Sequence, residues 1–450
     1  MLKLSLSFVS ISNKKYVLIL FILSVFLRML IESISTGVFF ALALKNISNS
    51  VASLITASSL FLSFIFSPIS GSLIDKKILK PSRCAIAFLF SAIAMPLFLI
   101  HSMPFTFSLF ANLFISVIFG IPSLIFLNSF SSILLHGKPA SGFSFFATFN
   151  TLGSLIGSIF GAFLVDQNTD LSNWVIVKLI GVILIGTFLV FSFSFFESYM
   201  EKIQEINEEF PPTTNGGKSD IIAPKPKNLI INAFIITRRV TKGIFSLYRS
   251  SKSNEYEQDT QIQNKIYLLG ITLAIFAASR LFFIHYYAFK IFDILGQEIF
   301  LFTLILNSAS ILAMLSYPIY GRISDVIGSW NFLIIGVLLH IPYLLGFLLL
   351  KNDLILIILW ALPLSSIIDV TQIGYVSETT NLRRRSTSIG FITGMVALGF
   401  MVGSITLSIF VNSPFIERLL LIPVIVPIIV FMGIIPLKKQ KLEENISFST

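Results

Sequence analysis

The chain has 450 residues, of which 55% are hydrophobic and 12% charged, about half the charge of an average soluble domain. This balance excludes an ordinary soluble fold, because the apolar residues form runs long enough to cross a bilayer as helices. The net charge of +10 does not indicate a nucleic-acid partner, since the basic residues lie between these runs and mostly on one side. The single cysteine, Cys84, excludes an intrachain disulfide and a Cys-based zinc site, and we expect no metal or cofactor.

Twelve apolar runs recur along the chain, so the sequence predicts an all-α membrane protein with twelve transmembrane helices. Because the runs continue to the end, the first is not a signal peptide. The predicted spans are 16–44, 51–74, 82–101, 104–135, 142–165, 173–197, 266–292, 298–324, 330–350, 353–376, 386–411 and 416–437.

The loops on one side of these spans hold most of the lysines and arginines outside the helices. The positive-inside rule therefore places both termini in the cytoplasm of a multi-pass protein, which we expect in the plasma membrane. The predicted organisation is an N-terminal six-helix bundle (1–197), a central linker (198–265), a C-terminal six-helix bundle (266–437) and a cytoplasmic tail (438–450).

The first helix carries two charges, Arg28 and Glu32. A charge near the bilayer centre costs about 2.5–3.5 kcal/mol even on the mildest scale. The two residues are four apart, so they share a helix face and can neutralise each other. Arg28 is therefore a candidate for a structural role, and Glu32 for proton coupling, because a carboxyl in a partly dry cavity can take up and release protons.

A sequence repeat closes the second and eighth spans: Pro68–Asp75 reads PISGSLID, and Pro318–Asp325 reads PIYGRISD. Two further pairs of landmarks recur, Gly142 with Gly390 and the pair Gly153/Gly157 with Gly399/Gly403. A duplicated six-helix unit predicts two pseudo-symmetric bundles about an axis along the membrane normal, with the substrate site between them.

The repeated segment resembles the loop signature Gly-x-Leu-x-Asp, followed by basic residues, of the major facilitator superfamily. The residues that carry the resemblance are Gly71, Leu73, Asp75, Lys76, Lys77 and Lys80 in the first copy and Gly321, Arg322, Asp325 and Gly328 in the second. The resemblance implies a cofactor-free secondary transporter that moves a small solute by alternating access, with these loops forming a cytoplasmic latch.

An acid at a helix end can pair with a base or with a helix N-terminus. For Asp75 we expect partners among Arg383, Arg384 and Arg385 at the start of the eleventh span, and for Asp325 the candidate is Lys138. A carboxylate that is merely solvated is the alternative for both.

The fifth span presents Gly153, Gly157 and Gly161 on one face, which allows a neighbouring helix to pack backbone to backbone. This segment also resembles the fifth-helix signature of the superfamily's antiporters, many of which are exporters, although Ser158 replaces the usual proline. Export and simple helix packing both remain open.

The linker contains Pro211-Pro212 and Gly216-Gly217 and then apolar residues at helical spacing from Leu229 to Leu247, interspersed with arginines and lysines. This pattern favours a helix lying on the cytoplasmic leaflet. A basic linker held by anionic lipids is the alternative.

Arg280 in the seventh span has Ile284 rather than an acid four residues on. It must therefore find Asp369, a bound anion or water. If the first loop is two residues longer than its partner, Arg280 is the counterpart of Arg28 on the other wall of the central cavity. Paired arginines resemble the phosphate-ester antiporters of the superfamily, so anion binding and a structural or gating ion pair both remain open. Asp369 is the second candidate for proton coupling.

We expect a structural role for His340, since the third helix of each half usually packs outward in this superfamily.

No nucleophile–base pair, metal cluster or phosphate-binding loop occurs in the sequence, so an enzyme is not expected. We expect a monomeric secondary transporter that binds a small molecule and is surrounded by membrane lipids, with protons as a candidate coupling ion. The alternatives are a non-transporting scaffold, assembly factor or sensor with the same fold and, within transport, an organic-anion antiporter.

Overall fold

The computed structural model describes residues 16–34, 49–100, 105–135, 138–166, 181–199, 254–296, 298–350, 352–380, 384–410, 413 and 419–430. Contacts divide the chain into two compact units, one formed by Met1–Ser198 with Ile266–Thr450 and the other by Tyr199–Lys265. The predicted surface helix between Leu229 and Leu247 lies outside the described residues, and the assignment of each bundle as a separate domain stays a prediction.

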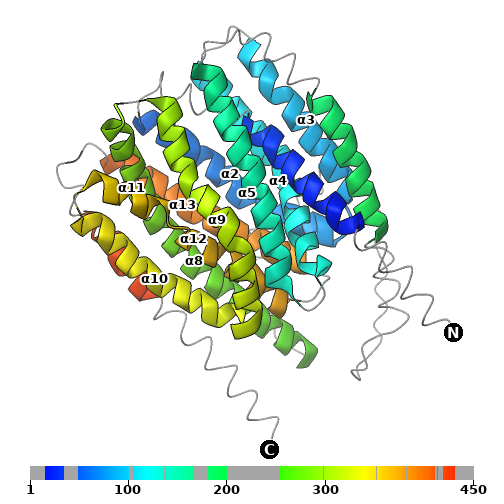
Figure 1. Cartoon of the computed structure of the whole chain (residues 1–450). Coiled ribbons are helices and arrows are strands. Elements are labelled where there is room, and N and C mark those ends of the chain that lie inside the picture. The colour runs from blue at the N-terminus through cyan, green and yellow to red at the C-terminus, as the bar shows by residue number, and fades with distance from the viewer. Residues whose placement is uncertain are drawn as a thin grey trace, which may run out of the picture. The chain divides into compact units, whose positions relative to one another are not determined.

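The prediction of a twelve-helix, all-α membrane protein is confirmed (Figure 1). Ten of the described helices are long and apolar enough to cross a bilayer, among them Tyr16–Ile34 and Gly181–Tyr199. The other elements are α2 (Asn49–Asp75), α3 (Pro81–Ile100), α4 (Phe105–Leu134), α5 (Pro139–Asp166), α8 (Asn254–Ile294), α9 (Ile299–Ile327), α10 (Ser329–Leu349), α11 (Asp353–Ala361), α12 (Leu364–Thr379) and α13 (Arg385–Phe410). Residues 422–430, in the last predicted span, are also helical.

The tenth predicted span is broken into two helices, which the sequence analysis did not foresee. Helix α11 ends before Leu362, and α12 begins after Pro363. Proline has no N–H to donate, and it disfavours helical backbone at the residue before it. The Leu362 N–H donates to the Leu359 carbonyl instead, and the Ser366 N–H donates to the Pro363 carbonyl. The break thus leaves irregular backbone within an apolar span, which membranes tolerate where it is enclosed by protein or lines a cavity.

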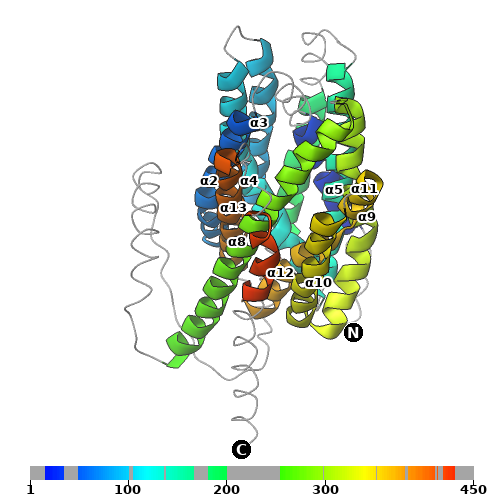
Figure 2. The same cartoon turned by 90° about the vertical axis from the view of Figure 1, so that its left-hand side faces the viewer.

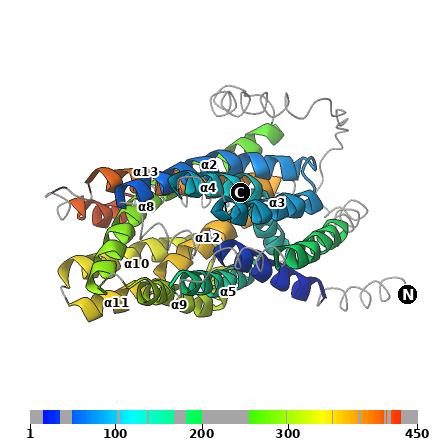
Figure 3. The same ribbon diagram turned by 90° about the horizontal axis from the view of Figure 1, so that it is seen from above.

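Two helix pairs join the bundles. Helix α2 of the first bundle lies beside α13 of the second, and α5 lies beside α9, as Figure 2 and Figure 3 both show. The contact between α5 and α9 begins where Asp325 of α9 accepts a hydrogen bond from Ala140 at the start of α5, and it extends to the ring pair Phe163–Phe300 near the end of α5. Between them, the Ser158 hydroxyl lies 3.3 Å from the Asn307 side-chain oxygen. Each pair joins the second helix of one bundle to the fifth helix of the other, so the internal repeat relates the two pairs.

Glycines mark where helices of one bundle cross backbone to backbone. A methyl group added at Gly153 would meet the carbonyl oxygen of Phe26, and one at Gly157 would meet that of Leu30. In the second bundle, Gly399 and Gly403 meet the carbonyls of Ala274 and Ala278 in the same manner. Gly161 is buried on the same helix as Gly153 and Gly157. Small residues permit this close approach, and a larger side chain would force the helices apart.

The same four contacts set the register of the repeat between the first helix and α8. Phe26 is equivalent to Ala274 and Leu30 to Ala278, so Glu32 is equivalent to Arg280. The prediction that Arg28 and Arg280 are counterparts is therefore wrong. The equivalent of Arg28 is the apolar Phe276, and the two halves carry opposite charges at the Glu32/Arg280 position.

Candidate functional site

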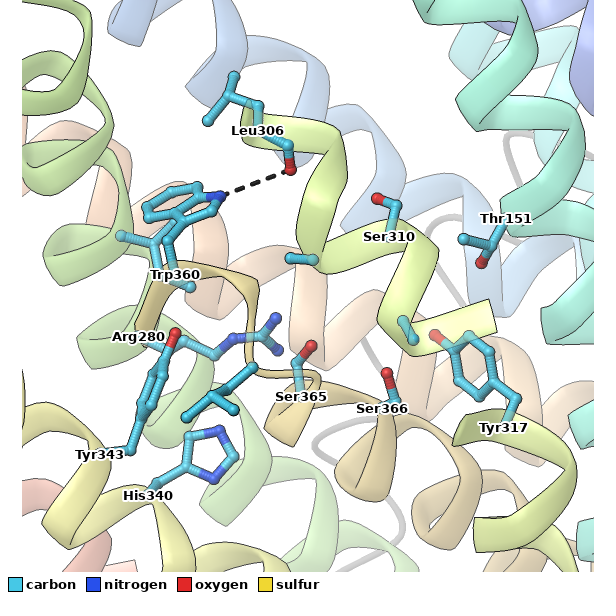
Figure 4. Close-up of a pocket in the computed structure, with 14 residues that line it drawn as sticks. Thr151, Arg280, Leu306, Ser310, Tyr317, His340, Tyr343, Trp360, Ser365 and Ser366 are labelled. Carbon is cyan, nitrogen blue, oxygen red and sulfur yellow. Dashed lines mark hydrogen bonds between the residues drawn. The ribbon is translucent and has the colours of Figure 1, made fainter. Parts of the chain in front are cut away.

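A cavity of about 240 Å³ lies almost wholly in the second bundle (Figure 4). Its walls come from α8, α9, α10 and the segment around the α11–α12 break, and Thr151 on α5 is the lining residue from the first bundle. The residues that line it are Thr151, Arg280, Ile284, Leu306, Ala309, Ser310, Ala313, Tyr317, His340, Tyr343, Trp360, Leu362, Ser365 and Ser366.

Arg280 supplies the cavity's positive charge. Its side chain runs from α8 into the cavity, and the guanidinium ends beside Ser365 in Figure 4. Among the described residues, its guanidinium makes no hydrogen bond and lies within 4 Å of no carboxylate. Its charge nevertheless acts on Tyr317, Tyr343, His340 and Asp369. The structure thus places a cation in a membrane cavity without a protein counter-ion in the described part of the chain.

Asp369 lies on α12 behind the cavity wall. The Tyr317 hydroxyl points to its Oδ2 atom at 3.4 Å, a long hydrogen bond. Asp369 and Arg280 are close enough to interact electrostatically but do not form an ion pair within 4 Å. Asp369, a bound anion and water were the partners expected for Arg280. This arrangement supports a direct ion pair with Asp369 the least of the three.

Aromatic side chains form much of the remaining wall. Trp360 lies in the last turn of α11 next to the break, and its indole N–H donates to the Leu306 carbonyl at 3.4 Å. Tyr343 and Tyr317 enter from α10 and α9. These residues were not predicted from the sequence, although Pro363 lies inside an apolar span between Trp360 and a pair of serines, a pattern that indicates such a site.

His340 also lines the cavity, and its side chain is almost fully buried. The packing of this helix, from which a structural role was expected, therefore does not keep His340 away from the cavity, and the structural role itself stays a prediction. Its Nδ1 atom lies 2.7 Å from the Gly336 carbonyl oxygen, and its ring contacts those of Phe276 and Tyr343 edge to face.

Arg28 and Glu32 form a self-contained cluster in the first bundle. The Arg28 Nη2 atom lies 2.9 Å from Glu32 Oε2, and its Nε–H donates to the Ser123 hydroxyl at 2.8 Å. A further hydrogen bond reaches the Gly120 carbonyl at 3.3 Å, and the guanidinium sits 5.0 Å from the ring centre of Phe88. The hydrogen-bonding groups of Arg28 are thus bonded to other residues of the protein. Neither Arg28 nor Glu32 lines the cavity.

The two motif aspartates bind helix N-termini across the bundle interface. Asp75 accepts hydrogen bonds from the backbone N–H groups of Ser386 and Thr387 at 3.2 and 2.7 Å and from the Thr387 hydroxyl. Asp325 accepts from the backbone N–H groups of Ala140 and Ser141 at 3.2 and 3.0 Å and from the Ser141 hydroxyl. The first N–H groups of a helix have no partner within it and carry partial positive charge, so a carboxylate is well placed there.

These contacts correct the partners expected for the two aspartates. Arg385 acts on Asp75 only through its charge, while its guanidinium donates to the Ser377 carbonyl at 2.9 Å and the Ser132 hydroxyl at 3.3 Å. Arg383 lies outside the described residues. Lys138 is exposed. Asp325 accepts hydrogen bonds from the backbone N–H groups of Ala140 and Ser141, which follow Lys138, and not from the Lys138 ammonium group.

The other motif residues lie around these contacts. A methyl group at Gly71 would collide with the Ser386 carbonyl, and one at Gly321 would collide with Ser144. Lys76, Arg322 and Arg384 are exposed, and Arg384 directly precedes α13. The two motif copies thus use glycine for close approach and aspartate for binding, while their basic residues face outward.

Comparison with known proteins agrees with this architecture. The family model described as Major Facilitator Superfamily matches residues 20–443, and the chain belongs to this family of non-enzymatic transporters. No curated protein matches the sequence. A similar solved structure is that of the human organic anion transporter MFSD10 (TETRAN), with a TM-score of 0.63 and 15% sequence identity over 94% of this chain and 99% of that one. At this identity the match shows the fold alone.

Proposed function

We propose that this protein is a secondary active transporter whose substrate is a small organic anion held by Arg280. The observation that carries the proposal is the guanidinium in the cavity with no counter-ion among the described residues. A charge at membrane depth is costly unless it is paired or solvated. An anionic substrate would supply the missing partner, and Arg is well suited to bidentate recognition of carboxylate, sulfonate or phosphate groups.

The rest of the cavity favours a substrate with an apolar body. Trp360, Tyr343 and Tyr317 offer ring surfaces, while Ser310, Ser365 and Ser366 offer a few hydroxyls. Small-molecule sites commonly combine apolar walls with a few polar groups that orient the ligand. The printed name of MFSD10 describes an organic anion transporter, which is consistent with this substrate class without establishing it here.

Alternating access would use the two interfaces between the bundles. With Asp75 and Asp325 bound to opposing helix N-termini, the ends of α2 and α9 are held to the partner bundle. We propose that these bonds form the cytoplasmic latch, that both termini are cytoplasmic in the plasma membrane, and that the direction is export, as the glycine pattern of α5 suggests. Glu32 and Asp369 remain the proposed groups for proton coupling.

The test is anion binding by purified protein. We would measure thermal stabilisation by benzoate, benzenesulfonate, succinate and phenyl phosphate, with benzamide as the uncharged control. Because a hydrogen bond to a charged group contributes about 1.5–3 kcal/mol, we expect Arg280→Gln to weaken anion binding roughly ten- to a hundredfold. Lys290→Gln removes a positive charge from an exposed site on the same helix and should leave binding unchanged. Equal binding of benzamide, or unchanged binding by Arg280→Gln, would refute an anion site.

Transport is tested separately, by counterflow of the bound anion in proteoliposomes. A carrier exchanges labelled for unlabelled anion, whereas a scaffold or sensor binds without exchange. Binding without counterflow would therefore favour the non-transporting alternative.

A further inference from the structure

We infer that His340 takes up a proton when an anion binds beside Arg280, so that anion and proton occupy the cavity together. This inference rests on the proposed anion site and names the group through which that site is coupled to protons. It adds a residue distinct from the two carboxylates, Glu32 and Asp369, and one that lines the cavity itself.

The hydrogen bond of His340 to its own helix fixes the tautomer. A backbone carbonyl only accepts hydrogen bonds, so the 2.7 Å contact between Nδ1 and the Gly336 oxygen requires the proton to be on Nδ1. The neutral ring therefore has its lone pair on Nε2. Nε2 is therefore the ring nitrogen left to gain or lose a proton.

The second nitrogen has no protein partner in the described structure. His340 lines the cavity, and its one hydrogen bond among the described residues is the one made by Nδ1. Among the described residues, the charge of Arg280 on α8 acts on His340, and the ring of Tyr343 on α10 contacts its ring. Tyr317 of α9 lines the same cavity, and Asp369 of α12 interacts with Arg280 and Tyr317. Arg280 supplies the fixed positive charge among these groups, and Figure 4 shows it entering the cavity beside His340.

Charge makes the two binding events mutually favourable. With the cavity empty, the Arg280 guanidinium opposes a second positive charge at His340. An anion between them removes this opposition, because it neutralises Arg280 and accepts a hydrogen bond from protonated Nε2. The proton comes from water on the side to which the cavity is open and forms an N–H bond at Nε2, and it leaves with the anion. By linkage, the proton must then strengthen anion binding by the same factor.

The closing experiment measures the binding of benzenesulfonate by calorimetry between pH 8 and pH 5. A sulfonate stays ionised throughout this range, so a pH dependence of its affinity reports on the protein. We expect affinity to rise severalfold as pH falls through the ordinary titration range of histidine, with a slope of at most tenfold per pH unit for one proton. Repeating the measurement in buffers of different ionisation enthalpy gives the proton uptake directly, and it should be greater than zero in the unaltered protein.

Three variants identify the group. His340→Gln should bind with an affinity that no longer depends on pH, while His285→Gln, at a histidine of α8 that does not line the cavity, should keep the slope. Asp369→Asn tests one of the two carboxylates proposed for proton coupling. If the affinity of Asp369→Asn no longer depends on pH while that of His340→Gln still does, the assignment of the proton to His340 is wrong. Binding without proton uptake in the unaltered protein would also overturn it. These results leave the anion site standing, whereas an absence of benzenesulfonate binding at every pH refutes the site and the coupling together.

Discussion

Arg28 and Arg280 lie on equivalent helices of the repeat and have opposite surroundings. Arg28 is nearly fully buried and bonded to Glu32, Ser123 and Gly120. Arg280 lies in a cavity. The sequence indicated which arginine is neutralised, because Glu32 follows Arg28 by one helical turn. It could not give the register between the halves, because that depends on where Gly153 and Gly399 cross the neighbouring backbones.

The Arg28–Glu32 pair is expected to stabilise the first bundle. Removing one member of a buried pair costs about 3–5 kcal/mol, and because the Glu32 side chain is 22% exposed we expect Glu32→Gln to lower the free energy of unfolding by about 3 kcal/mol. Unfolding by denaturant in mixed micelles would measure it.

The matched control for this prediction is Glu197→Gln, which breaks the 2.9 Å pair with the largely exposed Lys80. Exposed pairs contribute about 1 kcal/mol or less. Equal losses in the two variants would contradict a special role for the buried pair. If Glu32→Gln abolished proton-dependent transport without loss of stability, Glu32 would be a coupling group instead.

At the scale of helices, the carboxylates of Asp75 and Asp325 each act on the first turn of a helix in the other bundle. The repeat in the sequence located both aspartates and the helices that they bind. It did not distinguish a helix terminus from the basic side chains beside it, because both carry positive charge and occur together at the start of α13. Only the hydrogen bonds to Ser386 and Thr387 decide between them.

Asp75→Asn should weaken this contact, because the amide keeps an acceptor but loses the charge. Interactions of a charge with a helix terminus contribute about 0.3–2 kcal/mol, so we expect the population open at this end to increase roughly two- to thirtyfold. Spin labels on Ile78→Cys and Val326→Cys, both exposed, in a Cys84→Ser background would report the separation by pulsed electron resonance.

Asp353→Asn is the control for this measurement. Asp353 lies in the first turn of α11 and is exposed, so it meets a helix terminus without joining the bundles. Its replacement should leave the distance distribution unchanged. An unchanged distribution in Asp75→Asn would show that the contact does not hold this end closed.

The break between α11 and α12 shows another limit of sequence reasoning at this scale. A span of suitable length and hydropathy predicts one helix whether or not it is continuous, and proline is tolerated in intact membrane helices such as α2 and α4. The inward face of α10 was equally hidden, because a helix that is apolar on every side gives no periodic signal.

For the whole molecule, the fold could be predicted almost completely, because hydropathy marks the spans and the repeat relates the two halves. The cavity could not be predicted from the sequence, because the residues that line it come from separate helices and meet only when these helices pack together. Its position in the second bundle follows from the differences between the halves rather than from their likeness.

Rocking of the two bundles requires α5 and α9 to separate near Ser158 and Asn307, where their side chains touch. A disulfide between Ser158→Cys and Asn307→Cys in a Cys84→Ser background should therefore stop anion uptake by proteoliposomes, and reduction should restore it. A bridge between Ser82→Cys and Glu197→Cys, whose native side chains are 3.0 Å apart within one bundle, should leave uptake intact. Normal uptake by the oxidised 158–307 variant would exclude movement at this contact.

The charge of Arg280, which has no counter-ion among the residues that the structure describes, also determines how membrane voltage acts on transport. The guanidinium stays with the protein, so an anion that crosses alone moves one elementary charge per cycle. An inside-negative potential of 100 mV then contributes about 2.3 kcal/mol toward the outside, enough to sustain a concentration ratio of roughly fiftyfold. An anion that crosses with a proton on His340 moves no net charge, and only the pH difference and the anion gradient remain as driving forces. The ionisation of one imidazole would thus decide whether this cavity responds to voltage or to acidity.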